Sequence, residues 1–249
     1  MAGHSHWAGI KHKKAANDAK RGKVWSKIAR MIIVAAKDGG GDPGQNLALR
    51  YAIDKAKAAN MPKDTIEKAI KKGTGELGAV EYVDVLYEGY APGGVAIMVE
   101  GLTDNRNRTA PEIKKIFEKR GGSMGASGCV SYMFKKKGLI TVKTDAADEE
   151  LLMDIALTAG ADDFENIDEV YEITCEPEAY DGLKAVLEEK QIPLETSDLS
   201  RIPDSTIPVA DADTARKLLN LLEDFEDHDD VQEVYANFDI PEDILTHLQ

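Results

Sequence analysis

The chain has 249 residues, 43% of them apolar, which is enough to bury the cores of two or three domains. Its longest apolar run covers only residues 31–36, whereas a membrane-spanning helix needs roughly 18 to 20 apolar residues. The first residues are polar and basic, without the apolar stretch of a secretory signal. The two cysteines, Cys129 and Cys175, lack metal-ligand spacing. These features predict a cytoplasmic protein with no membrane partner, no metal and no cofactor.

The net charge of −14 is divided unevenly along the chain. Residues 1–72 hold 16 Lys and Arg against 6 Asp and Glu, a net charge of +10. Residues 73–249 hold 15 against 39, a net charge of −24. A cationic segment in an otherwise acidic protein is typical of contact with a polyanion, because cationic side chains neutralise phosphates and release their counterions.

The first part of the chain predicts a basic arm followed by three amphipathic helices. Residues 1–23 are too charged to bury an apolar face, and Gly22 is expected to interrupt any helix there. Apolar residues then recur at helical spacing. The expected helices run from Val24 to Lys37, from about Asn46 to Ala59, and from Pro62 to the residue before Gly73. Because such short helices need one another's apolar faces, residues 24–78 predict a three-helix domain.

After residue 79 the apolar period changes to that of strands alternating with helices. Expected strands are 82–87, 95–99, 129–134 (closed by Lys135 to Gly138), 139–142, 163–166, 170–174, 192–196, 206–209 and 231–236. Expected helices lie around Ile113 to Phe117 and at 149–159, 179–188 and 213–225. The order within 138–203 is that of a ferredoxin-like unit. The strand, helix and strand after residue 204 complete a second such unit. We therefore predict an α/β (α+β) fold in which the three-helix domain precedes two ferredoxin-like domains, with 138–203 inserted into a domain made of 79–137 plus 204–241.

The basic segment between Lys11 and Arg30 is the strongest candidate for a functional site, because its cations alternate with Trp7, His12 and Trp25. Trp25 lies on an apolar stripe, so we expect it in the core. The candidate nucleic-acid-binding residues here are Lys11, Lys13, Lys14, Lys20, Arg21, Lys23, Lys27 and Arg30. In the alternative interpretation, this segment docks on the acidic domain of the protein itself.

Arg106 and Arg108 are two further candidates for nucleic-acid binding. They lie between a strand and a helix, where Asp104 or Thr109 could cap the helix. Since the N-terminus of a helix attracts anions, both arginines could meet phosphates there. The alternative is that they pair with local carboxylates.

The other motifs favour structural roles. Residues 39–44 are glycine-rich but lack the Gly-Lys-Ser/Thr ending of a phosphate-binding loop. His4 and His6 have no evident third metal ligand, and the acidic run 223–230 lacks the alternating ligands of a calcium loop. We find no nucleophile with a local catalytic signature. The sequence therefore predicts no catalytic residues, no enzyme activity and no small-molecule substrate.

Numerous short motifs along nearly the whole chain resemble the YebC family. They are Met1 to Ser5 with Trp7, Ile10 to His12, Asp18 to Lys23, Gly39 to Pro43, Asn60 to Asp64, Tyr87 to Tyr90, Pro92 to Ala96, Thr103 to Thr109, Met133-Phe134, Val234-Tyr235 and Pro241. Two positions depart from the family pattern: His6 replaces a lysine and Leu47 replaces a proline.

The resemblance implies a cytosolic α/β protein of three domains without catalytic residues. Bacterial members of the family are described as DNA-binding transcriptional regulators, a mitochondrial relative acts as a translational activator, and some bacterial members work on ribosomes. We therefore expect a nucleic-acid-binding regulator of transcription. The alternative is a translation factor that binds ribosomal RNA, which a mainly Lys and Arg surface with few Asn or Gln side chains suits at least as well.

Overall fold

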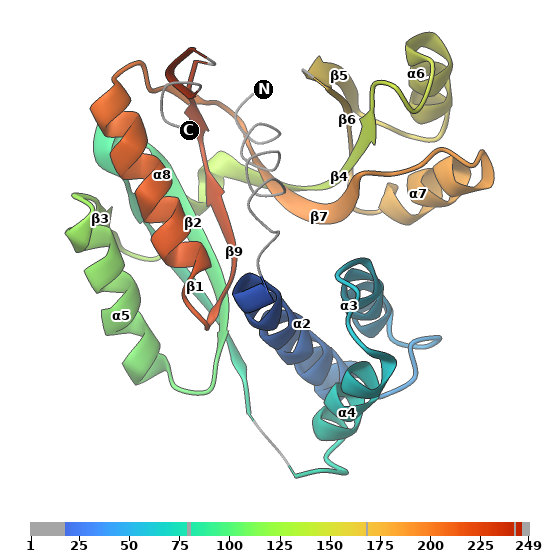
Figure 1. Ribbon diagram of the computed structural model, residues 1–249, viewed down its shortest axis with the longest axis horizontal. Coiled ribbons are helices and arrows are strands. Elements are labelled where there is room, and N and C mark those ends of the chain that lie inside the picture. Colours follow the sequence, from blue (N-terminus) through green and yellow to red (C-terminus); the bar gives the residue numbers. More distant parts are fainter. Residues whose placement is uncertain (1–17, 79–80, 168, 242, 246–249) are drawn as a thin grey trace. The chain divides into compact units, whose positions relative to one another are not determined.

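The computed structural model describes residues 18–78, 81–167, 169–241 and 243–245 (Figure 1). The chain forms two compact units. One consists of residues 131–207 with 237–239, and the other combines the described residues before 131 with 208–236 and 240–245. In sequence, the first of these units therefore interrupts the second.

The larger unit begins with three helices, α2 (Asp18–Gly39), α3 (Leu47–Ala58) and α4 (Lys63–Gly73). They bury a shared apolar cluster that includes Ile32, Leu49 and Ala56. Trp25 lies on the edge of this cluster, as its stripe predicted, and its Nε1 donates a hydrogen bond to the carbonyl of Ala59 (2.9 Å). The expected interruption at Gly22 is wrong, because α2 starts at Asp18 and runs through this glycine.

The same unit contains a four-stranded antiparallel sheet in the order β3-β1-β2-β9. Its elements are β1 (Val83–Tyr90), β2 (Ala96–Thr103), α5 (Arg106–Lys119), β3 (Ser123–Met124), α8 (Ala212–Glu226) and β9 (Val231–Ala236). Both helices cover one face of the sheet (Figure 1). They meet through Phe117 and Phe225, whose rings are 4.7 Å apart and edge to face.

One of the expected strands in this region is wrong, and another is shorter than expected and pairs elsewhere. Residues 129–134 form no strand of their own, because the chain turns there and passes through a short 3-10 helix, η2 (Ser131–Met133). Residues 206–209 do not join the four-stranded sheet: only β8 (Ile207–Pro208) is extended, and it pairs with β10 (Phe238–Asp239). In the four-stranded sheet, β1 lies between β3 and β2.

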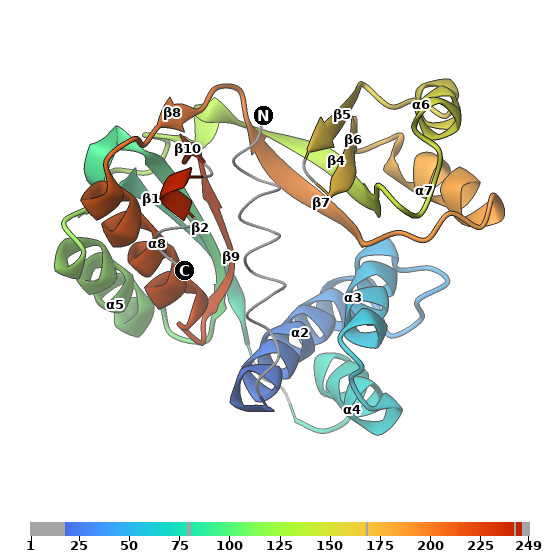
Figure 2. The same ribbon diagram turned by 45° about the horizontal axis from the view of Figure 1, so that its top comes forward.

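The smaller unit is an antiparallel sheet in the order β5-β6-β4-β7, the ferredoxin-like arrangement. Its elements are β4 (Phe134–Lys143), α6 (Glu149–Thr158), β5 (Asp163–Ile167), β6 (Val170–Cys175), α7 (Tyr180–Glu189) and β7 (Thr196–Pro203). Helices α6 and α7 lie on one face of it (Figure 2). The predicted α/β fold class is confirmed. Two details differ, since Lys135 to Gly138 belong to β4 and the last strand starts at Thr196.

Candidate nucleic-acid interface

The predicted basic residues fall into groups with different surroundings. Lys11, Lys13 and Lys14 lie outside the described residues. Lys20 and Arg21 lie in the first turn of α2, where the backbone is helical and Arg21 is exposed. The other predicted residues have described side chains, and most of them contact groups of the same unit rather than solvent alone.

Lys23 and Lys27 of α2 meet the C-terminal end of α8. The Nζ atom of Lys23 lies 3.2 Å from Oδ1 of Asp227 and 3.3 Å from its carbonyl oxygen. The Nζ atom of Lys27 donates to the carbonyl of Glu226 at 2.6 Å. The last carbonyls of a helix have no partners inside it and carry the negative end of its dipole. The two lysines therefore neutralise this end of α8.

Arg30, one turn further along α2, contacts the turn that follows α8. Its guanidinium donates to the carbonyl of Asp229 and lies 3.2 Å from Oδ1 of Asp230. It also stacks over the Tyr82 ring, 5.7 Å from the ring centre. Because its side chain is only 19% exposed, Arg30 belongs to a packed contact rather than to an open surface.

The same aspartate, Asp230, also forms an ion pair with Arg108. Nη2 of Arg108 lies 2.6 Å from Oδ2 of Asp230, and that oxygen accepts further hydrogen bonds from Thr103 (3.1 Å) and Thr109 (2.7 Å). Burial raises the pKa of Asp230, but the hydrogen bonds from Thr109, Arg108 and Thr103 outweigh burial and hold that pKa below its usual value. Asp230 is thus ionised and buried, and it forms ion pairs with Arg30 of α2 and Arg108 of α5.

Gly101 on β2 lets Asp230 come this close to the sheet. A Cβ atom at this position would lie 2.6 Å from the carbonyl oxygen of Asp230, closer than atoms can pack. The register between β2 and β9 shifts at the same place, between Glu100 and Gly101. The glycine and the irregular register together position the turn after α8.

Arg106 and Arg108 occupy the first turn of α5. The expected caps are wrong: Asn105 is the N-cap and accepts a hydrogen bond from the Arg108 backbone, whereas the Thr109 side chain belongs to the Asp230 cluster. Nη2 of Arg106 donates to the carbonyl of Asp84 at 2.9 Å. Arg108 is half exposed and also lies 3.1 Å from Asp104.

A row of lysines on α4 was not among the predicted contacts. Lys68, Lys71 and Lys72 are spaced as i, i+3 and i+4, on the side of α4 opposite the buried Ile66 and Ala69. Lys68 and Lys71 are exposed and Lys72 is partly exposed. Within the described residues, none of these three side chains has an ion pair. Their spacing opposite an apolar stripe was the sequence signal that could have identified them.

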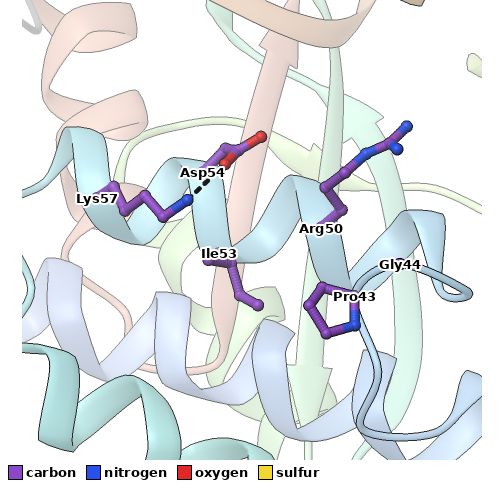
Figure 3. A pocket seen from close by; sticks show the side chains of 6 residues that line it. All are labelled: Pro43, Gly44, Arg50, Ile53, Asp54 and Lys57. Atoms are coloured by element: carbon purple, nitrogen blue, oxygen red, sulfur yellow. Dashed lines mark hydrogen bonds and ion pairs between the residues drawn. The ribbon is translucent and has the colours of Figure 1, made fainter.

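A shallow hollow of about 320 Å³ lies beside α3 (Figure 3). It is lined by Pro43, Gly44, Arg50, Ile53, Asp54 and Lys57. Lys57 reaches back to Asp54 at 3.3 Å. The lining contains no histidine, cysteine or hydroxyl group that could act as a nucleophile or proton carrier. The hollow is therefore part of the basic helical surface, to which Arg50 and Lys57 belong, and its lining has no recognisable reactive centre.

The described part of the chain contains no group of three or more His, Cys, Asp or Glu side chains arranged to hold a metal ion. Cys175 is buried and Cys129 is partly buried, and burial raises the pKa of both thiols. Among the described helices, none combines the length and the apolar character of a membrane span. The fold and its charges thus define an α/β protein with a basic, helical N-terminal part.

Comparisons with known proteins place this architecture in a family. The family model for the "TACO1/YebC protein N-terminal domain" matches residues 5–76, and the one for the "TACO1/YebC second and third domain" matches residues 82–238. The chain therefore belongs to the TACO1/YebC family, as its motifs indicated.

Relatives and a solved structure agree with this assignment. A "Probable transcriptional regulatory protein" of Elusimicrobium minutum is 51% identical over 100% of this chain and 99% of its own length. A protein of the same name from Persephonella marina is 54% identical over 98% of both chains. The crystal structure of a conserved hypothetical protein from Aquifex aeolicus is 51% identical, with a TM-score of 0.87 over 96% of this chain and 99% of that one. The relatives are thus named as regulators rather than as enzymes.

Proposed function

We propose that this protein is a nucleic-acid-binding regulator, and that its basic N-terminal part contacts phosphates. The observation that carries the proposal is the row of Lys68, Lys71 and Lys72. The chain has 45 acidic and 31 basic side chains, so its cations have ample carboxylates to pair with. A row of exposed or partly exposed lysines that has no ion pair with any described carboxylate is therefore available to an external polyanion.

Duplex DNA is the first candidate partner, because the relatives are named probable transcriptional regulatory proteins. In this role the protein acts in the cytoplasm and needs no catalytic residue. Helices α2, α3 and α4 contain no Asn or Gln, the side chains that pair most readily with adenine. Asn46, just before α3, is buried and bonded to Leu49, Ala35 and Gly40. Contact through phosphates rather than base edges is therefore expected to dominate.

The same observation favours a second candidate, folded RNA such as that of the ribosome. A surface of lysines and arginines without Asn or Gln follows the backbone of an RNA helix as well as that of DNA. The proposed contacts in either case are the arm residues Lys11, Lys13, Lys14, Lys20 and Arg21, together with the α4 row. The remaining candidates, Lys23, Lys27, Arg30, Arg106 and Arg108, contribute only to the extent that they exchange their present protein partners for phosphate.

The test compares binding of a short labelled DNA duplex and of an RNA hairpin over a series of salt concentrations. In the variant Lys68→Ala/Lys71→Ala/Lys72→Ala we expect about a tenfold loss of affinity and a salt slope lower by about 2 to 3, since each lost phosphate contact lowers the slope by about 0.9. Tighter binding of DNA supports the first candidate partner, and tighter binding of the RNA hairpin supports the second.

A matched control changes the charge by the same amount elsewhere. Lys115, Lys136 and Lys190 are also exposed and lack an ion pair within the described residues, but they do not form a row. The triple alanine variant at these positions should bind almost like the parent protein. If both triple variants lose affinity equally, the α4 row is not an interface, and if the parent protein binds neither probe, the proposed function is wrong.

A further inference from the structure

Some of the cations that the sequence suggested for nucleic acid are already occupied by an internal anionic group. We call residues 226–230, which end α8 and lead into β9, the acidic turn. It contains the carboxylates of Glu226, Asp227, Asp229 and Asp230 in addition to the negative end of the α8 dipole. Its partners on α2 are Lys23, Lys27 and Arg30, which are spaced as i, i+4 and i+7 along one side of the helix.

The contacts between α2 and the acidic turn differ in how exposed their side chains are. The Lys23 and Asp227 side chains are 47% and 56% exposed, so water and salt screen this pair. The Arg30 and Asp230 side chains are 19% and 3% exposed, and Asp230 is held by several further hydrogen bonds. The outer pair is therefore weak and exchangeable, whereas the inner pair is a fixed anchor.

We propose that the acidic turn is an autoinhibitory phosphate mimic that competes with nucleic acid for Lys23 and Lys27. This inference rests on the proposed function and concerns its regulation. A polyanion would replace Asp227 and the terminal carbonyls of α8 at these two lysines, while Arg30 stays on Asp230. Nucleic acid therefore binds Lys23 and Lys27 only when its phosphates displace Asp227 and the terminal carbonyls of α8.

The competition reduces non-specific binding. Lysines without a partner bind any polyanion, and this binding depends only on charge and salt. When two of them are already neutralised within the protein, a nucleic acid releases fewer counterions on binding and binds less tightly. The acidic turn therefore weakens binding by charge alone, so tight binding depends more on the other contacts between protein and nucleic acid.

The experiment is a double-mutant cycle measured with the same labelled DNA duplex and RNA hairpin. The first variant, Asp227→Asn/Asp229→Asn, weakens the mimic at two exposed positions and leaves Asp230 in place. The second, Lys23→Ala/Lys27→Ala, removes the contested cations. Asp154→Asn/Asp213→Asn is the control, because it changes the net charge equally at two exposed positions in α6 and α8.

We expect the acidic-turn variant to bind about three- to tenfold more tightly than the parent, with a salt slope steeper by about 1 to 2. The lysine substitutions should change parental affinity less than about twofold, and they should abolish the gain when combined with the acidic-turn variant. The control variant should show neither effect.

The outcomes separate this inference from the proposed function. If the parent and the acidic-turn variant bind equally tightly, nucleic-acid binding stands and competition by the acidic turn is refuted. A gain of the same size in the control variant, or one that survives the lysine substitutions, also refutes it, because the gain then comes from net charge alone. If neither protein binds, both proposals fail. A gain confined to the acidic-turn variant and lost with the lysines supports the inference.

Discussion

Replacing Asp230 with asparagine tests whether this buried carboxylate organises the contact between α2, α5 and the turn after α8. The substitution keeps the size of the side chain, removes its charge and replaces one acceptor oxygen with an NH2 donor. Asp230 is 3% exposed and pairs with Arg30 at 3.2 Å and Arg108 at 2.6 Å. Removing one partner of a buried ion pair costs about 3 to 5 kcal/mol, because the remaining charge stays poorly solvated.

The lower end of that range applies to Asp230→Asn. Arg108 is half exposed and keeps Asp104 as a second partner, whereas Arg30 loses the carboxylate partner that the described residues provide. We therefore expect the free energy of unfolding to fall by about 3 kcal/mol. Urea unfolding followed by circular dichroism measures it as a lower midpoint at unchanged slope. Asp227→Asn removes one exposed pair and should cost less than about 1 kcal/mol.

The pH dependence of the unfolding free energy provides an independent check, because the direction of the change can be predicted. The pKa of Asp230 is lowered from 3.8 in the folded protein, so its stabilisation is present above pH 3.8 and is lost as the pH falls through the lowered folded-state pKa. The stability difference between the parent and Asp230→Asn should therefore shrink in strong acid. An effect no larger than that of Asp227→Asn at neutral pH, or a difference that does not depend on pH, would refute the reasoning.

Two further predictions concern other parts of the fold. Burial, with Glu165 opposite it in the sheet, raises the pKa of Glu172 from 4.5 to about 7, so ionisation costs stability as the pH rises between these values. Glu172→Gln should match the parent in unfolding free energy below pH 4.5 and exceed it by about 3 kcal/mol above pH 7; pH-independent stability in the parent would contradict this. Gly73→Ala should lower the free energy of unfolding by about 1 to 3 kcal/mol, because its Cβ would press on the Ile33 carbonyl and lie 2.7 Å from that of Ala36. Gly22→Ala, in a helical position with open space around it, should stabilise by about 0.5 to 1 kcal/mol, and destabilisation by both changes would argue against close packing as the cause.

Local signals predicted most of the helices and strands. The stripe of Trp25, Ile28 and Ile32 marks the buried side of α2, because helical spacing places these residues on one face. The smaller unit has the predicted ferredoxin-like order because its strands alternate with helices in sequence. Local signals did not predict the pairing of every strand: the strand expected at 206–209 forms as β8 but pairs with β10, outside the four-stranded sheet.

The helix at Gly22 shows that a single glycine in the sequence does not by itself mark the end of a helix. A single glycine costs a helix only about 1 kcal/mol. Packing of the following residues against α3 and α4 outweighs this cost, since Ile28, Ile32 and Ile33 are all buried. Tertiary contacts therefore carry α2 through a position that looks like an end in the sequence.

The amino-acid sequence by itself determined the family, the fold class and the uneven distribution of charge, because these depend on which residues occur and in what order. Which of the cations are available was decided only by the tertiary structure. Lys23 and Asp227 are 204 positions apart, and only the fold brings them to 3.2 Å. Lys68, Lys71 and Lys72 of α4 have no ion-pair partner within the described residues. The physical reason is that charge is a property of each residue, whereas neutralisation depends on distances that no local pattern records.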